Sequence, residues 1–235
     1  MSNLTVLIQG PLDKTSLSYL PYYKTIGPVV ISHWNSDDFS LLNYYDISGC
    51  KIISASPPEK QLIYPRWDTF SFQLTSITNG LKNIDTPHVL KMRSDERYGN
   101  LDPIIERFNI DQSKIVCGNI FFKKWDIMNS HIGDHIYIGN TSLLLEAYIN
   151  IYKFCKIYNT AKYPEQIPVW AIMHILLNQE IEKDNLLTKK DEFIKIFDVV
   201  DINEMAPFIA KFNHFKIVFT NHFQYKDIIK SMEEL

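Results

Sequence analysis

The chain has 235 residues, 46% of them apolar and 13% aromatic, so it is long enough to bury a sizeable core. Its net charge of -3 excludes a broad basic face for nucleic acid and a polybasic membrane anchor. Three widely spaced cysteines fit neither a zinc pattern nor a disulfide framework, and neither a signal peptide nor a bilayer-spanning apolar run is evident, so we expect a cytoplasmic protein.

Strand and helix signals alternate along the chain, which predicts an α/β layered fold. Residues 179–203 are charged and harder to place, and no internal repeat or low-complexity linker divides the chain, so we expect one domain spanning residues 1–235. In chain order we expect a strand at 4–9, a helix at 14–25, strands at 28–32 and 51–55, a helix at 65–84, a strand at 88–92, a helix at 103–108, strands at 115–122 and 135–139, helices at 141–157 and 164–178, a strand at 215–219 and a helix at 226–232.

The clearest of these elements is the helix at 65–84. Its apolar residues recur at alternating spacings of three and four, which places them on one helical face. They are Trp67, Phe70, Leu74, Ile77, Leu81 and Ile84. Pro65 stands where a first helical residue is expected. Gly80 lies inside the pattern, and the periodicity does not explain it.

The most informative stretch is residues 89–98, where an apolar strand breaks abruptly into charged residues. In open α/β sheets, ligands bind just beyond the carboxyl ends of strands. A carboxylate pair flanked by arginines at such a point can hold a divalent cation and an anionic ligand together. The segment from Leu4 to Pro11 has the same form, an apolar run that ends in Gln9, Gly10 and Pro11. A solvated turn is the alternative interpretation of Asp95 and Glu96.

Three segments together resemble glycosyltransferases of the GT-A fold, and more narrowly the WavE-type lipopolysaccharide-biosynthesis family. They are Ile8-Gln9-Gly10-Pro11, the helical stretch from Thr75 to Leu81 with Asn79-Gly80-Leu81, and Val89 to Asp95 with its Leu-Lys-x-Arg-Ser-Asp run. Pro164-Glu165-Gln166 is a fourth, weaker match. The likeness spans roughly residues 4–178. It implies a single Rossmann-like domain with a mixed, mostly parallel central sheet flanked by helices, whose nucleotide-binding half is about 1–100 and whose acceptor-side half is about 101–235.

The resemblance implies a nucleotide-diphosphate sugar as donor, with UDP as the expected nucleotide although the base is left open. It places Gln9, Gly10 and Pro11 against the nucleoside. It places Asp95 where the last acid of the usual Asp-x-Asp motif binds Mn²⁺ or Mg²⁺. Arg93 stands where the first acid is expected, so metal dependence is an open question, and an arginine there can itself neutralise part of the diphosphate charge.

The remaining donor-side candidates follow from the chemistry of a leaving diphosphate, which needs positive charge from a metal, arginine or lysine. Arg66 opens the long helix, where the helix dipole also favours an anion. Lys91 and Arg93 share a side of their strand, so we expect one of them to bind the diphosphate and the other to pair structurally with Asp95 or Glu96; Ser94 follows them. Glu96 and, from the C-terminal segment, His222 complete the candidate metal ligands with Asp95. Trp34, at a strand end, is a weaker candidate for stacking on a sugar.

An inverting transfer needs a carboxylate to take the proton of the acceptor hydroxyl. The resemblance favours Glu165, although a glutamate at a helix N-terminus is also stabilised there without any function. Asp134 is the rival base. His131, Asp134 and His135 are a less favoured metal cluster, because no further strong ligand lies near them in sequence.

The predicted function is transfer of a sugar to a glycan or lipid-linked glycan acceptor in surface polysaccharide synthesis. A sugar nucleotidyltransferase is an alternative, but the loop after the first strand lacks the glycine-rich, arginine-containing sequence usual in that class. A non-catalytic nucleotide- or glycan-binding module is a third interpretation, which the missing first acid permits.

Overall fold

The computed structural model describes residues 3–59, 68–119, 134–151, 153, 166–179 and 190–209. It confirms the predicted fold class, because helices and mixed, mostly parallel sheet strands make an α/β structure. The chain divides into two compact units. The first contains residues Met1–Gly99, Asn140–Leu145 and Pro207–Lys216, and the second contains the rest.

Four parallel strands form the sheet of the first unit, in the order β3-β2-β1-β4. They are β1 (Leu4–Gln9), β2 (Val29–Trp34), β3 (Cys50–Ala55) and β4 (His88–Arg93). These bounds match the predicted strands closely, because the central strands of a parallel sheet are covered on both faces and therefore appear as nearly continuous apolar runs. All six residues of β2 are buried, as are five of the six in β1.

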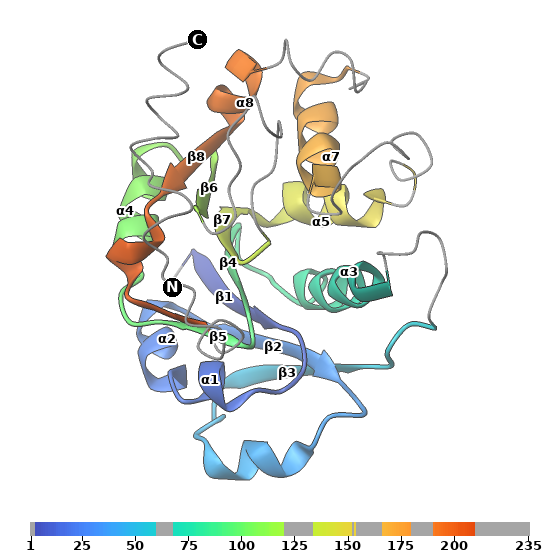
Figure 1. Ribbon diagram of the computed structural model, residues 1–235, viewed down its shortest axis with the longest axis vertical. Helices are drawn as coiled ribbons and strands as arrows, with labels where there is room; N and C mark the ends of the chain where they lie inside the picture. The colour runs from blue at the N-terminus through green and yellow to red at the C-terminus, as the bar shows by residue number, and fades with distance from the viewer. Residues whose placement is uncertain are drawn as a thin grey trace. The chain divides into compact units, whose positions relative to one another are not determined.

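Helices cover this sheet on both sides: Figure 1 shows α3 (Asp68–Leu81) on one side of β1, β2 and β3, and α1 (Lys14–Leu17) and α2 (Leu20–Ile26) on the other. The prediction of one helix over 14–25 was wrong, because the segment forms two short helices. Pro21 lies in the first turn of α2. A proline has no N–H and clashes with the preceding turn, so it is suited to a helix start and not to a helix interior. A 3₁₀ helix, η1 (Phe39–Tyr44), lies between β2 and β3.

Helix α3 confirms the predicted amphipathic helix over its described part, and its packing explains Gly80. A Cβ added to Gly80 would collide with the side chain of Leu7 in β1 and come within 3.2 Å of the Ser32 Cβ in β2. Ser32 also donates a hydrogen bond from Oγ to the Ser76 carbonyl of α3, at 2.7 Å. The glycine therefore allows the helix to approach the two central strands closely.

A two-stranded antiparallel ribbon, which the sequence analysis missed, joins β5 (Glu96–Tyr98) to β9 (Pro207–Ile209). Both strands are only three residues long, too short to give a clear period-two signal. The ribbon brings a segment from near residue 208 into the first unit, directly beside the charged cluster.

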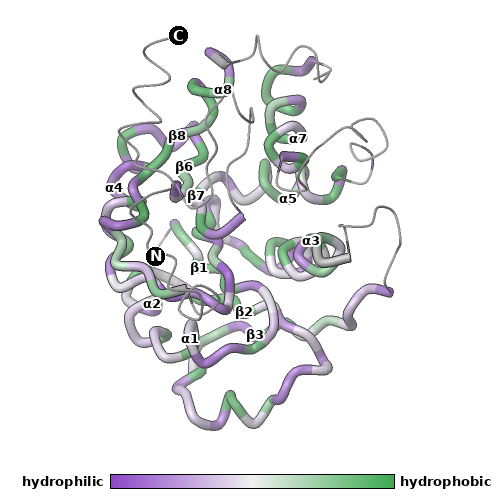
Figure 2. Tube along the Cα trace, viewed as in Figure 1, coloured by the Kyte–Doolittle hydropathy of each residue, from purple (hydrophilic) through white to green (hydrophobic). Residues whose placement is uncertain are grey.

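In the second unit β6 (Ile115–Gly118) pairs antiparallel with β7 (Ile136–Asn140) and parallel with β8 (Phe197–Val200). The sequence analysis missed β8, which directly follows the charged helix α8 (Lys190–Ile196). The other elements here are α4 (Asp102–Ile110), α7 (Gln166–Leu177) and η3 (Ile202–Met205), while α5 (Thr141–Ile149) begins in the first unit and ends in the second. Figure 2 shows α7 mostly hydrophobic, and its first eight residues are buried, as predicted.

The predicted strand at 215–219 and helix at 226–232 lie outside the described residues. Within the described part of the chain, no helix combines the length and the apolar character needed to cross a membrane.

Candidate functional site

The candidate site lies at the carboxyl ends of β1 and β4, which are neighbours in the first unit. Their register pairs Gln9 with Arg93, so both strands end at the same level. The Ser94 N–H donates to the Gln9 carbonyl at 2.9 Å, and the Gly10 N–H donates to the Ser32 carbonyl of β2 at 3.1 Å. Three strand ends are thus tied together by backbone hydrogen bonds, at the position where open α/β sheets bind ligands.

Gly10 is the point at which the chain turns away from β1. Its φ of +121° is a backbone conformation that residues with a side chain rarely adopt. A Cβ at this position would also lie 2.7 Å from the Ser94 Oγ. The turn therefore requires glycine on two counts, and it leaves Pro11 exposed beside it.

Gln9 is buried, and its side chain accepts a hydrogen bond from Ser76 of α3 at Oε1, at 2.6 Å. The side chain therefore joins β1 to α3 across the sheet. Gln9 was predicted to contact the nucleoside. In the structure it lies at the end of β1, and its amide oxygen is hydrogen-bonded to Ser76 inside the protein.

Asp37, in the turn after β2, organises the neighbouring loop and was missed from the sequence. One carboxylate oxygen, Oδ2, accepts from the backbone N–H of Leu12 at 2.9 Å and from that of Trp34 at 3.0 Å. The His33 Nδ1 lies 3.3 Å from the same oxygen. The predicted sugar-stacking residue Trp34 is buried and packs edge-on against Phe72, so its ring belongs to the core.

The charged cluster centres on Arg93, which makes a two-point pair with Asp95. The Arg93 Nε donates to Asp95 Oδ1 at 2.9 Å, and Nη2 donates to Oδ2 at 2.8 Å. The same Nε lies 3.2 Å from Oε1 of Glu96. The side chains of Arg93 and Asp95 are 21% and 29% exposed, whereas that of Glu96 is 0% exposed. Asp95 is therefore the acid that faces outward, and Glu96 is the acid inside.

Tyr98 holds the Glu96 carboxylate directly, and Tyr23 in turn holds the backbone of Tyr98. Tyr98 donates from its hydroxyl to Glu96 Oε2 at 2.6 Å, and the Tyr98 N–H donates to the Tyr23 hydroxyl at 3.2 Å. Burial raises the pKa of Tyr98 well above its ordinary value, and the neighbouring Glu96 carboxylate raises it further. Burial likewise raises the pKa of Tyr23. Both hydroxyls therefore stay protonated at neutral pH.

Lys91, predicted to contact the diphosphate, is completely buried in β4, two residues before Arg93. Residues 91–96 thus carry two cations, Lys91 and Arg93, and two carboxylates, Asp95 and Glu96. The segment is neutral as a whole, so it provides no surplus positive charge for an anion.

Of the predicted metal ligands, Asp95 fits a divalent cation and Glu96 does not. Mg²⁺ and similar ions are commonly held by one or two carboxylates together with waters and substrate phosphates, and a ligating carboxylate is itself usually hydrogen-bonded. Asp95 is partly exposed and oriented by Arg93, whereas both Glu96 oxygens face donors inside the protein. Across the described ranges, His, Cys, Asp and Glu side chains form no group of three suited to a metal ion.

Asp134, the rival catalytic base, lies just before β7 in the second unit. Its Oδ1 is 3.8 Å from Nε2 of His135. Burial raises the pKa of Tyr137 and of Tyr148, and the Asp134 carboxylate adds to the rise in both. The other predicted residues, Arg66, His131, Glu165 and His222, lie outside the described residues, so their roles stay predictions.

Arg97 was also missed. Its guanidinium lies between the rings of Tyr19 and Phe208, 4.9 Å and 4.6 Å from the two ring centroids. The contact holds β9 beside β5 and thereby covers the segment that carries Glu96 and Tyr98. A period-two pattern of Glu96 and Tyr98 inward and Arg97 outward was the available signal, but three residues are too few to recognise it.

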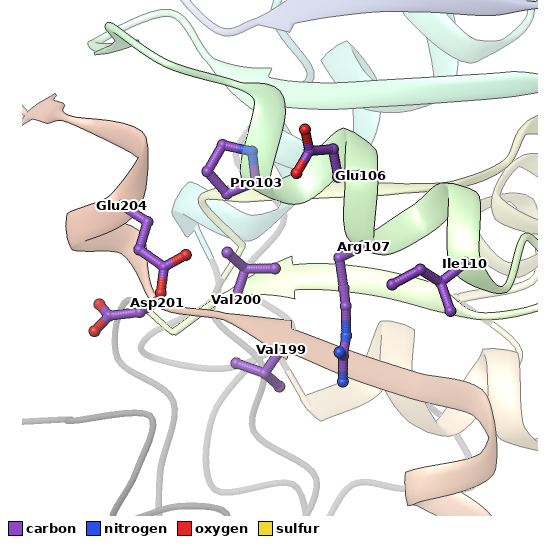
Figure 3. Close-up of a pocket in the computed structure, with 8 residues that line it drawn as sticks. All are labelled: Pro103, Glu106, Arg107, Ile110, Val199, Val200, Asp201 and Glu204. Atoms are coloured by element: carbon purple, nitrogen blue, oxygen red, sulfur yellow. The ribbon is translucent and has the colours of Figure 1, made fainter.

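A second feature is a hollow of about 360 Å³ in the second unit, between α4 and the segment from β8 to η3 (Figure 3). Its lining combines four apolar residues with the acids Glu106, Asp201 and Glu204 beside Arg107. Arg107 is paired with Asp198, with Nε–Oδ2 at 2.6 Å and Nη2–Oδ1 at 3.2 Å. None of the predicted site residues that the structure describes lines this hollow.

Comparison with known proteins gives only weak similarities. No family model matches the chain. The structure of 4-diphosphocytidyl-2C-methyl-D-erythritol synthase from Anaerococcus prevotii is 12% identical with a TM-score of 0.43, over 98% of this chain and 97% of that one. Mouse xyloside xylosyltransferase 1 is 11% identical with a TM-score of 0.42, over 84% of each chain.

In sequence, a protein named methionine synthase from Sulfolobus acidocaldarius is 29% identical over 130 residues. The match covers 53% of this chain and only 37% of that protein. Similarity at these levels places the chain in no family and identifies no activity.

Proposed function

We propose that the protein is a nucleotide-sugar-dependent glycosyltransferase. The observation that carries the proposal is the convergence of two sequence motifs at one edge of a parallel sheet: the Gly10 turn after β1 packs against Ser94, next to the paired Arg93 and Asp95 after β4. These are the segments whose sequences resemble GT-A enzymes.

In this proposal the exposed backbone at Gly10 and Pro11 receives the nucleoside, and Asp95 receives the diphosphate end of the donor. A divalent cation bound there would supply the positive charge that a leaving diphosphate needs. Arg66 is the proposed arginine contact to the diphosphate. Asp95→Ala should therefore abolish transfer and weaken metal-assisted nucleotide binding while the fold stays intact.

The catalytic base is proposed to be Glu165, with Asp134 as the alternative. Removing a general base typically lowers a rate by about 10²–10⁴-fold. Glu165→Gln should lower turnover by that factor and leave donor affinity unchanged, while the matched variant Asp134→Asn keeps turnover near that of the parent. The reverse result assigns the base to Asp134.

The acceptor is proposed to be a glycan or a lipid-linked glycan in surface polysaccharide synthesis. The cytoplasm is the proposed location, because nucleotide sugars are available there and thiols stay reduced. Cys50 and Cys117 are both free thiols, which agrees with a reducing compartment.

The proposal is tested first by binding. A thermal-shift panel of nucleoside diphosphates and nucleotide sugars, each with and without Mn²⁺, should show one base preferred. A ligand at 100 times its dissociation constant stabilises the folded protein by about 2.7 kcal/mol, which is readily measured. The absence of any shift across the panel would contradict the proposal.

Turnover then separates the proposed activity from its alternatives. A glycosyltransferase should release the nucleoside diphosphate from its donor sugar, slowly with water and faster with the acceptor. A sugar nucleotidyltransferase would instead release pyrophosphate from a nucleoside triphosphate and a sugar phosphate. Binding without either release would favour a non-catalytic module.

A further inference from the structure

We propose that Glu96 and Arg93 are positioning residues: Glu96 holds Arg93 from inside the protein, and Arg93 fixes the Asp95 carboxylate, which alone of the three meets the ligand. This assigns Glu96 a role other than metal ligand and Arg93 a role other than diphosphate clamp. The inference rests on the proposed function only for the identity of the ligand.

The first step is the burial of Glu96. Its side chain is 0% exposed, with Oε1 at 3.2 Å from Arg93 Nε and Oε2 accepting from the Tyr98 hydroxyl at 2.6 Å. A carboxylate removed from water is tolerated only when a cation and hydrogen-bond donors replace that water. Both oxygens are directed at such partners, so Glu96 acts through them and not on a ligand.

The second step is the rigidity of what supports Glu96. Tyr98 is fully buried and its N–H donates to the hydroxyl of Tyr23, which is also fully buried. Fully buried side chains of this size occupy single, closely packed positions. Tyr98 therefore presents its hydroxyl to Glu96 from a fixed position.

The third step is the geometry of Arg93. A planar guanidinium that binds a carboxylate at two points fixes the orientation of both groups. Arg93 does so with Asp95 at 2.9 Å and 2.8 Å, while Glu96 contacts the same guanidinium. Two carboxylates already surround one cation, so a diphosphate on Arg93 would have to compete with Asp95. Holding Asp95 is therefore the role that the charges favour.

The pairing leaves Asp95 able to act. Each carboxylate oxygen has a second lone pair, and outer partners of this kind orient ligating carboxylates in metal sites. Loss of such a partner typically lowers metal affinity about 10–100-fold. We expect the same loss in Mn²⁺-dependent binding when the support of Asp95 is removed.

The test combines three single variants and their doubles: Tyr98→Phe, Arg93→Ala and Asp95→Asn. Calorimetry measures the binding of Mn²⁺ alone and of UDP with Mn²⁺ or with EDTA. Arg93→Ala should weaken Mn²⁺-dependent binding about 10–100-fold, and it should have no further effect in the Asp95→Asn background or in EDTA. Tyr98→Phe should weaken binding in the parent and have no effect in the Arg93→Ala background. Equal losses from Arg93→Ala in EDTA and in Mn²⁺ would make Arg93 a clamp and overturn the inference.

A ligand-independent measurement accompanies the calorimetry, because the ligand belongs to the proposed function. The NMR signal of the Arg93 Nε–H should be protected from solvent exchange in the parent and in Tyr137→Phe, but not in Tyr98→Phe. Tyr137→Phe is the matched control, because Tyr137 is another buried tyrosine, and its hydroxyl lies 2.6 Å from the hydroxyl of the buried Tyr148. If the parent protein binds neither Mn²⁺ nor UDP nor any other nucleotide of the panel, the proposed function is wrong. The Arg93 Nε–H signal then decides by itself whether Glu96 and Tyr98 position Arg93. An unchanged Arg93 signal in Tyr98→Phe would overturn the positioning role.

Discussion

Two arginine–carboxylate pairs of similar geometry occur in the two units of the chain, and their surroundings differ. Arg93 binds Asp95 at 2.9 Å and 2.8 Å, and Arg107 binds Asp198 at 2.6 Å and 3.2 Å. Arg93 also contacts Glu96, whose side chain is completely buried and accepts a hydrogen bond from Tyr98. The side chain of Arg107, by contrast, is 42% exposed and lines a hollow. An arginine–carboxylate pair by itself therefore does not indicate a functional site. The difference lies in whether buried residues support the arginine, as Glu96 and Tyr98 support Arg93.

The Arg107–Asp198 pair is sufficiently explained by structure. It joins α4 to β8, two adjacent elements of the second unit. Exposed pairs of this kind contribute little free energy because water and salt screen them.

The largest expected difference between the two regions comes from removing one acid in each. Glu96→Ala should lower the free energy of unfolding by about 3–5 kcal/mol, because it breaks a buried ion pair and leaves Tyr98 without its acceptor. Asp198→Ala should lower it by less than about 1 kcal/mol, because the pair is exposed. Urea denaturation measures both. Similar losses for the two variants would remove the distinction that burial makes.

Gly10 extends the comparison from side chains to the backbone of the first region. Gly10→Ala should destabilise the protein by about 1–3 kcal/mol, because it forces a φ of +121° on an alanine whose Cβ meets Ser94. The control is Gly49→Ala, at a φ of +74° with no atom within 4 Å of the added Cβ, which should cost about 1 kcal/mol. Nucleotide affinity should fall only for the Gly10 variant. Equal behaviour of the two variants would argue against close packing at the Gly10 turn.

Alkaline pH should act on the first region through its tyrosines. A group whose pKa is raised on folding contributes stability that is present below its unfolded pKa and is lost as pH rises through the folded pKa. For Tyr98 the loss should therefore begin near its unfolded value of about 10 and continue upward. We expect the free energy of unfolding, measured from pH 9 to 11.5, to fall less steeply in Tyr98→Phe than in the parent. Above pH 10 the two slopes should differ by about 1.4 kcal/mol per pH unit. Arg107→Ala should keep the slope of the parent, and a parental slope in Tyr98→Phe would contradict the expectation.

Salt should show the smallest effect, and only in the second region. The Arg107–Asp198 contribution, less than about 1 kcal/mol, should disappear as ionic strength rises to 1 M, where the screening length is about 3 Å. Arg107→Ala and the parent should then be equally stable. Arg93→Ala should remain less stable than the parent at the same salt concentration, because the partner Glu96 is buried. Loss of that difference at high salt would mean that the first cluster is screened like the second.

The sequence alone was sufficient for the elements whose pattern is local. The buried strands β1, β2 and β4 and the amphipathic helix α3 each carry a continuous or periodic apolar signal, so their type and nearly all their bounds were predicted. The position of Gly10, Arg93 and Asp95 at strand ends followed from the same signals, because the carboxyl ends of neighbouring parallel strands lie at one edge.

Other features needed the tertiary structure, because their causes are not local. Pro21 divides the helix predicted at 14–25. Strand β8 directly follows the charged helix α8, in a segment for which the sequence predicted no element. Gly80 is explained only by the Leu7 side chain opposite it, which belongs to a distant part of the chain.

For the charged cluster of Arg93, Asp95 and Glu96, too, some features follow from the sequence and others only from the tertiary structure. The sequence by itself determined that Arg93, Asp95 and Glu96 follow a buried strand, since apolar and charged residues there are adjacent. It could not tell the outward acid from the inward one, because that depends on β5 pairing with β9 and on Tyr98 and Tyr23 meeting beneath Glu96. Adjacent residues share a sequence environment, but only the packing of distant segments decides which of them water and ligands can reach.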